Sequence, residues 1–338
     1  MSDTLFYKLL ILRTPGIGAA RFNALVQSFG SVADAAASLK VDTSHSDMVR
    51  REMDNAARLG IKYISDDDEF YPDALRSVKN HPPVLSVRGN LDALRHKIVS
   101  MVGTRHATAA GMGFMADLAN AFASHGYVVA SGMAAGTDTA AHRGALRSGN
   151  AASTIAVVAG GADYIWPLEN ESLYYEILSR GAVISEMPVG FVPIATNFIQ
   201  RNRWVAGICE KLILGEADLK SGSMATARFA IDFGRQLWAI PSHPTDLRAL
   251  GPNSLIKSGQ AKLCCGMSDF FDANHKTQKN EKNIISENSV LDKIGIVPVS
   301  ESVLAQVVKK TISEIKRDLV VLELQGLIRK TDGGYVRI

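Results

Sequence analysis

Six continuous apolar segments alternate with segments of helical length between residues 97 and 265, and this alternation constrains the fold more than any other feature. Apolar strands linked by helices imply a parallel sheet covered on both faces, with ligands bound where strand carboxyl ends meet helix N-termini. We predict strands over 98–102, 128–130, 154–158, 182–185, 211–214 and 236–240, and helices near 108–124, 137–148, 169–180, 196–208 and 221–233. The expected fold class is α/β, with a Rossmann-like parallel sheet domain over residues 97–272.

The residues before this domain have two different patterns. Leucines in residues 1–60 recur at helical spacing, and Pro15-Gly16-Ile17-Gly18 forms a tight turn before a helix. This turn resembles a helix-hairpin-helix, whose amides can face a phosphate; a small helical bundle without DNA contact is the alternative. Residues 61–96 are predicted to be a connector that packs on the central domain, with a short strand at 84–87 after two prolines.

The residues after the central domain begin with a polar stretch at 273–289, which we interpret as a linker. Residues 290–338 are predicted to form three short helices and a final hairpin, as in a winged-helix-like domain. Residues 276–338, which include this domain, hold 11 basic and 8 acidic side chains, which accounts for the whole net charge of +3. Such a domain can read duplex DNA or contact proteins, and its lysines can also form a solvated face. A polyanion site in the main body must therefore be a local cluster of charge.

Several classes of protein lack support in the sequence. The first residues do not have the layout of a signal peptide, and no apolar run approaches the roughly 20 residues that span a bilayer, so we expect a cytoplasmic protein without a membrane partner. The cysteines Cys209, Cys264 and Cys265 form no C-x-x-C pair, so no metal site is expected. No G-x-x-x-x-G-K-[ST] is present, and Gly111-Met112-Gly113 comes too late for a dinucleotide fingerprint; we place it in a helix or its first turns.

Polar loops that contain glycine follow four of the predicted strands. They span residues 102–105, 131–138, 160–163 and 221–226, and the second and fourth open helices. Glycines let backbone amides approach an anion, and a helix N-terminus adds partial positive charge. Several such loops on one sheet edge favour a phosphate-binding groove, although glycine also ends strands in ordinary folds.

A cluster of polar and aromatic side chains, Gln200-Arg201-Asn202-Arg203-Trp204, falls in a predicted helix. The N–H groups of an arginine guanidinium can donate to two phosphate oxygens at once, and aromatic rings can stack on unpaired bases. The alternative is a set of salt bridges with Trp204 in the core.

Four carboxylates, Asp138, Asp163, Glu186 and Glu216, are predicted near the same sheet edge. They could supply a general base, but we favour a role in orienting loops or arginines through hydrogen bonds. His142, near a helix start, is either a proton carrier or a residue that orients a loop.

These motifs, in this order, resemble the DNA-processing protein A (DprA/Smf) family. The resemblance is carried by VGTRHATAAG (102–111), SGMAAGTDTAAHRGAL (131–146), TIAVVAGGADYIWPLEN (154–170), VISEMPVG (183–190), RNRWVAGICEKLILGEADLKSGSMATARFAIDFGRQLWAIP (201–241) and LGPNSLIKSGQA (250–261). It implies a SAM-like helical domain, a Rossmann-like domain and a winged-helix-like domain. It also implies a homodimer without catalytic turnover or cofactor, which binds single-stranded DNA and loads the recombinase RecA during natural transformation.

The resemblance also implies a set of DNA-contacting residues. These are Gly103, Thr104, Arg105, Ser131, Gly132, Gly136, Asp138, Arg201, Asn202, Arg203, Ser221, Gly222 and Ser223. The sequence departs from the family pattern at Ala135, where an arginine is usual, at Thr137, and at Ser242 and His243 after Pro241. A phosphate contact is therefore missing at residue 135 or is supplied by another side chain.

The rival interpretation is an enzyme that cleaves N-glycosidic bonds of nucleotides on a related fold. Its P-G-G-x-G-T-x-x-E signature is absent, so Glu186 or Glu216 would have to be the catalytic carboxylate. A pure protein-interaction scaffold is the third alternative.

Overall fold

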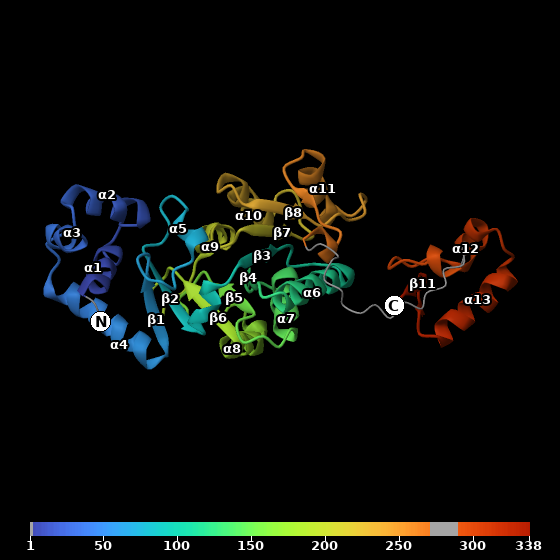
Figure 1. Cartoon of the computed structure of the whole chain (residues 1–338), viewed down its shortest axis with the longest axis horizontal. Coiled ribbons are helices and arrows are strands. Elements are labelled where there is room, and N and C mark those ends of the chain that lie inside the picture. Colours follow the sequence, from blue (N-terminus) through green and yellow to red (C-terminus); the bar gives the residue numbers. More distant parts are fainter. Residues whose placement is uncertain (1–2, 271–289) are drawn as a thin grey trace. The chain divides into compact units, whose positions relative to one another are not determined.

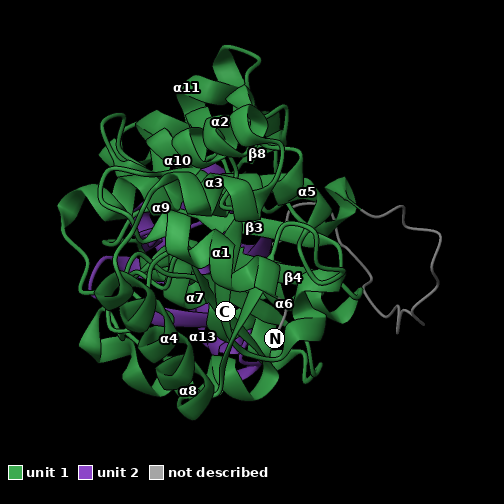
Figure 2. Cartoon of the chain, turned by 90° about the vertical axis from the view of Figure 1, so that its left-hand side faces the viewer, with its two compact units in different colours: residues 1–272 green, residues 273–338 purple. Residues whose placement is uncertain are grey.

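The structure, a computed structural model, describes residues 3–270 and 290–338, and its contacts divide the chain into two compact units (Figure 2). The first unit comprises residues 1–272 and the second residues 273–338. The linker predicted at 273–289 lies outside the described residues. Each unit has a hydrophobic core of its own.

A single sheet organises the described part of the first unit. Its nine strands lie in the order β1-β2-β6-β5-β4-β3-β7-β8-β9 (Figure 1). The strands are β1 (Ile61–Ser65), β2 (Val84–Gly89), β3 (Ile98–Val102), β4 (Val128–Ser131), β5 (Thr154–Val157), β6 (Gly181–Ser185), β7 (Lys211–Leu214), β8 (Gln236–Ala239) and β9 (Lys262–Leu263). From β3 the chain passes outward through β4 and β5 to β6, and then returns to β7 on the other side of β3. This reversal makes the crevice between β3 and β7 the topological switch point of the sheet.

The sheet is mixed, although mostly parallel, which corrects the expectation of a parallel sheet. The strands from β6 to β9 in sheet order pair in parallel. In contrast, β1 pairs antiparallel with β2, and β2 pairs antiparallel with β6. The segment between β1 and β2 contains only the short helix α5 (Asp73–Arg76), which cannot serve as the long crossover that parallel neighbours need. The predicted connector therefore extends the sheet at its edge.

Helices cover both faces of the sheet. One layer contains α6 (Ala109–Ser124), α7 (Thr137–Arg147) and α8 (Glu171–Arg180), and the other contains α9 (Ala195–Gly207) and α10 (Gly222–Asp232) (Figure 1). Alternate residues of β3 face the two layers, because side chains of a strand point to opposite sides in turn. Val99 and Met101 are buried with α6 and α7, whereas Ile98 and Val102 are buried in the core that includes residues of α9 and α10. Beyond β8 lies the shorter helix α11 (Leu250–Lys257).

Most of the predicted elements of the central region are confirmed. The six predicted strands correspond to β3 through β8, and the five predicted helices to α6 through α10, with ends that differ by up to two residues. Gly111 and Gly113 lie inside α6, as expected. Two strands were not predicted, β1 and the two-residue β9 at the opposite edge. Short 3-10 helices, also unpredicted, lie at Leu91–Arg95, Leu168–Asn170, Leu247–Ala249 and Met267–Asp269.

The N-terminal helices pack beside β1 as a helical layer (Figure 1). They are α1 (Asp3–Leu12), α2 (Ala19–Phe29), α3 (Val32–Ser38) and α4 (Thr43–Arg58). The side chains of Ser31 and Asp42 cap α3 and α4 by accepting backbone N–H bonds. The buried cluster of this layer includes Leu9, Phe22 and Val49, and also Val84 of β2. The layer therefore shares its core with the edge of the sheet.

A buried ion pair joins the helical layer to the sheet. The Arg13 guanidinium donates to both carboxylate oxygens of Glu52, with its Nη2 at 2.7 Å from Oε1. The Tyr63 hydroxyl in β1 donates to the same carboxylate at 2.5 Å. Both charged side chains are only 10% exposed, so neither charge has much access to water. Removing one partner would leave the other buried without its counter-charge.

The second unit has two α-helices and a hairpin among its described residues. They are α12 (Glu301–Val308), α13 (Ile312–Leu324), β10 (Ile328–Thr331) and β11 (Gly334–Arg337), preceded by a 3-10 helix at Val290–Lys293. The hairpin is antiparallel, and Tyr335 of β11 also bridges to Val299. The predicted helices and final hairpin are thus present, with the first helix of 3-10 type. Throughout the described ranges of both units, no helix combines the length and apolar character needed to cross a membrane.

We predict that Glu52→Ala lowers the free energy of unfolding by about 3–5 kcal/mol, because Arg13 then stays buried without its partner. Urea unfolding followed by circular dichroism measures this change. Glu69→Ala is the matched control, since Glu69 pairs with Arg95 at 3.3 Å on the surface, with side chains 68% and 51% exposed. Glu69→Ala should lower the free energy of unfolding by no more than about 1 kcal/mol. Equal effects of the two substitutions would contradict the assigned role of the buried pair.

Candidate nucleic-acid interface

A cavity of about 250 Å³ lies at the switch point, beside the carboxyl ends of β3 and β7. It is open to solvent, and four separate segments of the chain form its wall. They are the loop after β3, the start of α7 with its preceding loop, the middle of α9 and the start of α10. The lining residues are Val102, Gly103, Thr104, Arg105, His106, Ala134, Asp138, Arg201, Asn202, Ser221, Gly222, Ser223 and Thr226. We call this cavity the switch-point cavity.

The loop after β3 is held by Glu216, which follows β7. The Thr104 N–H donates to the Glu216 carbonyl at 2.6 Å. The Glu216 carboxylate accepts the Thr108 N–H at 2.7 Å and also the Thr108 hydroxyl. Thr108 is the N-cap of α6. Glu216 therefore fixes both ends of the loop that carries Arg105 and satisfies a backbone donor at the start of α6.

The loop after β4 comes into close contact with the loop after β3. A β-carbon at Gly136, whose φ is +76°, would lie 2.6 Å from the Thr104 carbonyl oxygen and 2.5 Å from that of Arg105. Only glycine fits this approach without displacing the backbone. The amides of Gly132 and Ala134 donate to the Asp138 carboxylate at 3.1 and 3.3 Å. These amides are thus occupied within the protein and are not available for a phosphate.

The start of α10 presents donors to the cavity. Ser221 is the N-cap, and its hydroxyl accepts the Met224 N–H at 3.3 Å. The Ser223 hydroxyl donates to the Gly103 carbonyl at 2.6 Å, which ties α10 to the loop after β3. The first N–H groups of a helix lack acceptors within the helix, and the helix dipole adds partial positive charge there. The N-terminus of α10 is therefore suited to an anion bound in the cavity.

Arg201 is a buried cation beneath the cavity. It is 5% exposed, and its Nη1 donates to the Val157 carbonyl at 2.5 Å and to the Gly132 carbonyl. Burial lowers the pKa of Arg201 to about 10, which still leaves it charged at neutral pH. Burial raises the pKa of the neighbouring Asp138, while the Arg201 charge opposes that rise. Arg201 therefore joins the loop after β4 to the end of β5 through its Nη1, while its buried Nε has no hydrogen-bond partner among the described residues.

Arg105 is the exposed arginine in the wall of the switch-point cavity. Its guanidinium carbon lies 5.0 Å from the centroid of the Trp166 ring. The Trp166 ring contacts Phe198 edge to face, with centroids 4.5 Å apart. A cation over an aromatic face is held by the ring quadrupole while its remaining N–H groups stay free. Arg105 is thus oriented beside the cavity and available to a ligand.

The structure does not bring all of the predicted residues to this cavity. Arg203 lies in another cavity, where its Nη2 donates to the Lys79 carbonyl at 2.7 Å. Residues two apart on a helix point in different directions, which is why Arg201 and Arg203 do not line one cavity as the sequence analysis expected. Ser131 is fully buried, and its hydroxyl donates to the Met101 carbonyl at 2.6 Å. Gly132 and Gly136 contribute only their backbones, since the Gly132 N–H donates to Asp138 and Gly136 allows the close approach to the loop after β3.

Three of the four carboxylates orient loops, as the sequence interpretation favoured. Asp138 and Glu216 do so as described above, and Asp163 accepts the Gly190 N–H at 2.9 Å. Glu186 lies in the cavity that contains Arg203, and burial raises the pKa of its carboxyl. Among the described residues, no group of three or more His, Cys, Asp and Glu side chains could hold a metal ion.

His142 is a structural residue of α7. Its Nδ1 lies 2.6 Å from the Thr154 hydroxyl in β5, and the imidazole is fully buried. Burial lowers the pKa of His142 to about 3, so the ring stays neutral at physiological pH. It joins a helix to a strand and does not orient a loop or carry protons.

Sequence reasoning did not single out three of the residues around the cavity. His106 lines it, and Trp166 and Phe198 support Arg105. Thr226 also lines the cavity and belongs to the predicted loop at 221–226. His106 directly follows Arg105, so the loop motif contained that signal. Trp166 is 61 residues from Arg105 in the sequence, and nothing in the local pattern predicts their contact.

We predict that Arg201→Ala lowers the free energy of unfolding by about 3 kcal/mol or more, because two buried carbonyls and Asp138 lose their cation. Arg105→Ala removes the same side chain from an exposed position and should change stability by no more than about 0.5 kcal/mol. Chemical denaturation of both variants measures the difference. If Arg201→Ala were as stable as the parent protein, the loops would not depend on this guanidinium.

Comparisons with known proteins identify the family of the chain. Residues 62–275 match the model of the family described as DNA recombination-mediator protein A. The chain is 32% identical to Protein Smf of Escherichia coli, over 81% of this chain and 77% of that protein. It is 33% identical to Protein Smf of Synechocystis over 70% of this chain, but spans only 55% of that relative's length.

Two solved structures are also similar. The X-ray structure of DNA processing protein A from Streptococcus pneumoniae has a TM-score of 0.66 and 29% identity, and covers 80% of this chain and 96% of that chain. The structure of DNA processing protein A from Helicobacter pylori, reported for its single-stranded-DNA binding mode, has a TM-score of 0.56 and 31% identity, with coverage of 62% and 94%. Together with the family match, these similarities show that the chain belongs to the DNA recombination-mediator protein A family, the DprA/Smf proteins.

Proposed function

We propose that this protein binds single-stranded DNA through phosphates held at the switch-point cavity. The observation that carries the proposal is the meeting of exposed Arg105 with the N-terminus of α10 in one open cavity. The helix amides and the guanidinium both favour phosphate oxygens. The Asn202 amide lines the same cavity and adds a further donor.

Binding of this kind is largely independent of base sequence. The available donors in the cavity wall suit the backbone, and backbone contacts carry no direct sequence information. The thirteen residues named from the resemblance are proposed as the DNA site, with a division of tasks. Arg105, Asn202, Gly222 and Ser223 are proposed to face the strand. Arg201, Asp138, Gly136 and Ser131 are proposed to keep the loops in place.

The wider role is proposed from family membership. A recombination mediator delivers single strands to a recombinase, so we infer that the protein protects incoming DNA and loads RecA during natural transformation. We further propose a homodimer, and a winged-helix-like second unit that contacts either DNA or protein. The proposed boundaries are 1–60 for the helical SAM-like domain, 61–96 for the connector and 97–272 for the Rossmann-like domain, with the winged-helix-like domain at 290–338.

Non-catalytic binding explains the site better than nucleotide hydrolysis. A hydrolase would need a carboxylate free to act as a base or nucleophile in the switch-point cavity. The Glu216 carboxylate is engaged by Thr108. Glu186 lines a different cavity. Asp138 holds two loop amides.

We predict tight, salt-dependent binding with a preference for single strands over duplexes of equal length. Fluorescence anisotropy across a salt series should give a log–log slope of about −0.7 for each phosphate neutralised. Arg105→Ala should make the slope less steep by about 0.7 and weaken binding for all base sequences alike. Arg147→Ala, an exposed arginine paired with Asp117 near the end of α7, is the control with the same charge change.

Absence of binding to either form of DNA at low salt would reject the proposed function. Equal losses for Arg105→Ala and Arg147→Ala would reject the placement of the strand at the switch-point cavity, because a general charge effect would then account for both.

We also predict that Ala135→Arg strengthens binding. Ala135 is exposed and adjoins Ala134 in the cavity wall, at the position where relatives usually have arginine. The new cation should steepen the salt slope by about 0.7. Ala135→Gln adds a long polar side chain without charge and should leave the slope unchanged. A slope unaffected by arginine would mean that the strand does not pass this loop.

A further inference from the structure

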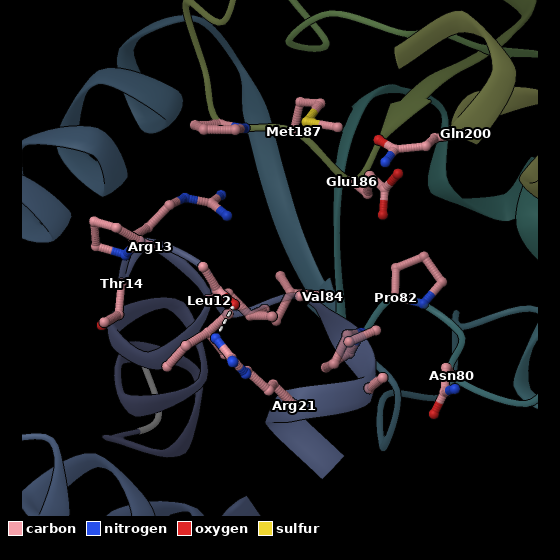
Figure 3. Close-up of a pocket in the computed structure, with 18 of the residues that line it drawn as sticks. Leu12, Arg13, Thr14, Arg21, Asn80, Pro82, Val84, Glu186, Met187 and Gln200 are labelled. Atoms are coloured by element: carbon pink, nitrogen blue, oxygen red, sulfur yellow. Dashed lines mark hydrogen bonds between the residues drawn. The ribbon is translucent and has the colours of Figure 1, made fainter. Parts of the chain in front are cut away.

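The loop of residues 77–83, which leads into β2, contains His81 and the prolines Pro82 and Pro83. We call it the proline loop. Together with part of the helical layer, it borders a cavity of about 730 Å³, and Asn80 and Pro82 lie in its wall (Figure 3). The position of the proline loop therefore determines the shape of this cavity, and side chains from other segments hold the loop in place.

Both ring nitrogens of His81 lie against groups that can only accept a hydrogen bond. The Nδ1 is 3.0 Å from the Val78 carbonyl oxygen, and the Nε2 is 3.2 Å from a carboxylate oxygen of Asp66. A neutral imidazole carries one N–H and can donate to only one of these oxygens, whereas the imidazolium donates to both. The geometry of the proline loop therefore fits the charged form of His81.

Asp66 connects His81 to the helical layer. The Nζ of Lys8 in α1 lies 2.6 Å from one carboxylate oxygen of Asp66 and 2.9 Å from one of Asp67, and the Lys8 side chain is only 6% exposed. Lys8 offsets the charge of one of these two carboxylates, and His81 in its charged form offsets the other. Loss of the His81 proton therefore leaves this partly buried cluster with one negative charge in excess.

The groups around the imidazole act on its protonation in opposite directions. The hydrogen bond to Asp66 is the largest influence and, with the Val78 carbonyl, raises the pKa of His81, while partial burial and the charge of Arg76 oppose this rise. Arg76 has an ion pair of its own within α5. The Tyr71 ring packs against the imidazole, with centroids 5.8 Å apart, and burial raises the pKa of the Tyr71 hydroxyl, which stays neutral.

Two further attachments of the proline loop do not involve the imidazole. The Tyr71 hydroxyl donates to the Pro82 carbonyl at 2.6 Å, and the Nη2 of Arg203 in α9 donates to the Lys79 carbonyl at 2.7 Å. Neither of these donors loses its proton near neutral pH. Deprotonation of His81 therefore weakens the attachment of the loop to Asp66 and the helical layer, while the attachment to α9 remains.

We propose that His81 is a pH-sensitive switch, which ties the proline loop to Asp66 when the imidazole is charged and loosens the loop when the imidazole is neutral. The switch acts on the border of the cavity between the helical layer and the sheet, and it does not rest on the proposed single-strand binding. A neutral ring that donates to Asp66 turns a lone pair toward the Val78 carbonyl, and the other tautomer turns a lone pair toward the carboxylate. Either tautomer loses one of the two contacts.

The direction of the pH dependence follows from the raised pKa of His81 in the folded protein. The contact stabilises the loop fully below the pKa of about 6.5 that histidine has in an unfolded chain. This stabilisation is lost as the pH rises through the higher pKa of the folded protein. We therefore expect a loop that is firmly held at slightly acidic pH and looser at alkaline pH.

His81→Gln tests the proposal, because glutamine can still donate to Asp66 but does not titrate. His96→Gln is the matched control, at an exposed histidine that follows the 3-10 helix at Leu91–Arg95. The experiment measures hydrogen exchange by NMR, corrected for the intrinsic pH dependence of exchange. Its reporters are the backbone amides of Asp66 and residue 81, which donate to the Pro83 and Val78 carbonyls.

In the parent protein and in His96→Gln, the protection of these two amides should fall several-fold between about pH 6 and about pH 9, the range in which a histidine of raised pKa titrates. In His81→Gln, their protection should not change with pH. Protection that is constant with pH in the parent protein would overturn the proposal. A pH dependence in His81→Gln equal to that of the parent protein would also overturn it, because another group would then be responsible.

An NMR titration of the histidine rings in the parent protein gives a second test, which does not depend on the folding of any variant. The ring signal that is missing from His81→Gln identifies His81. Its pKa should lie above about 6.5, and Asp66→Asn should lower it, because the carboxylate that favours the charged ring is gone. A His81 pKa at or below about 6.5, or one that Asp66→Asn leaves unchanged, would reject the switch.

Discussion

The arrangement of the switch-point cavity depends on one buried guanidinium. Arg201 extends from α9 under the sheet edge and bonds to a carbonyl in the loop after β4 and to the carbonyl of Val157, the last residue of β5. A buried cation is costly unless polar groups surround it, so the carbonyls and Asp138 must stay in place around it. Because Asp138 also holds the amides of Gly132 and Ala134, the same charge fixes the shape of the loop after β4. That loop in turn supports the loop that carries Arg105, through the close approach at Gly136.

This arrangement separates the residues that build the site from those that can contact a ligand. Polar residues with buried side chains hold the loops, while Arg105 and the start of α10 remain accessible. A motif in which both kinds of residue are adjacent, such as Arg201-Asn202-Arg203, therefore combines different tasks. Arg201 is buried, Asn202 lines the switch-point cavity, and Arg203 lines a separate cavity that Glu186 also borders.

The strands and helices of the central region follow from the sequence because burial on both faces demands apolar runs, as in Ile98–Val102 and Lys211–Leu214. The strand β1 was not predictable in the same way, since Lys62 interrupts the apolar residues of Ile61–Ser65 and only Ile61 and Ile64 are buried. The positions of the glycine-containing loops were predicted correctly. Their amides were expected to bind phosphate, but those of Gly132 and Ala134 donate to Asp138. The partner of each donor lies in another segment, as Glu216 does for Thr108, and one sequence does not reveal such pairs.

The shared core of the helical layer and the sheet edge limits how this architecture can be rearranged. Val84 of β2 completes the cluster formed by Leu9, Phe22 and Val49, and Tyr63 of β1 bonds to Glu52 of α4. The first sixty residues therefore cannot be exchanged as a unit for the corresponding helices of another protein. Recombination of genes at this boundary would expose apolar surface on both fragments, so new combinations of helical layer and sheet would survive only when the two strands β1 and β2 travel with the helices.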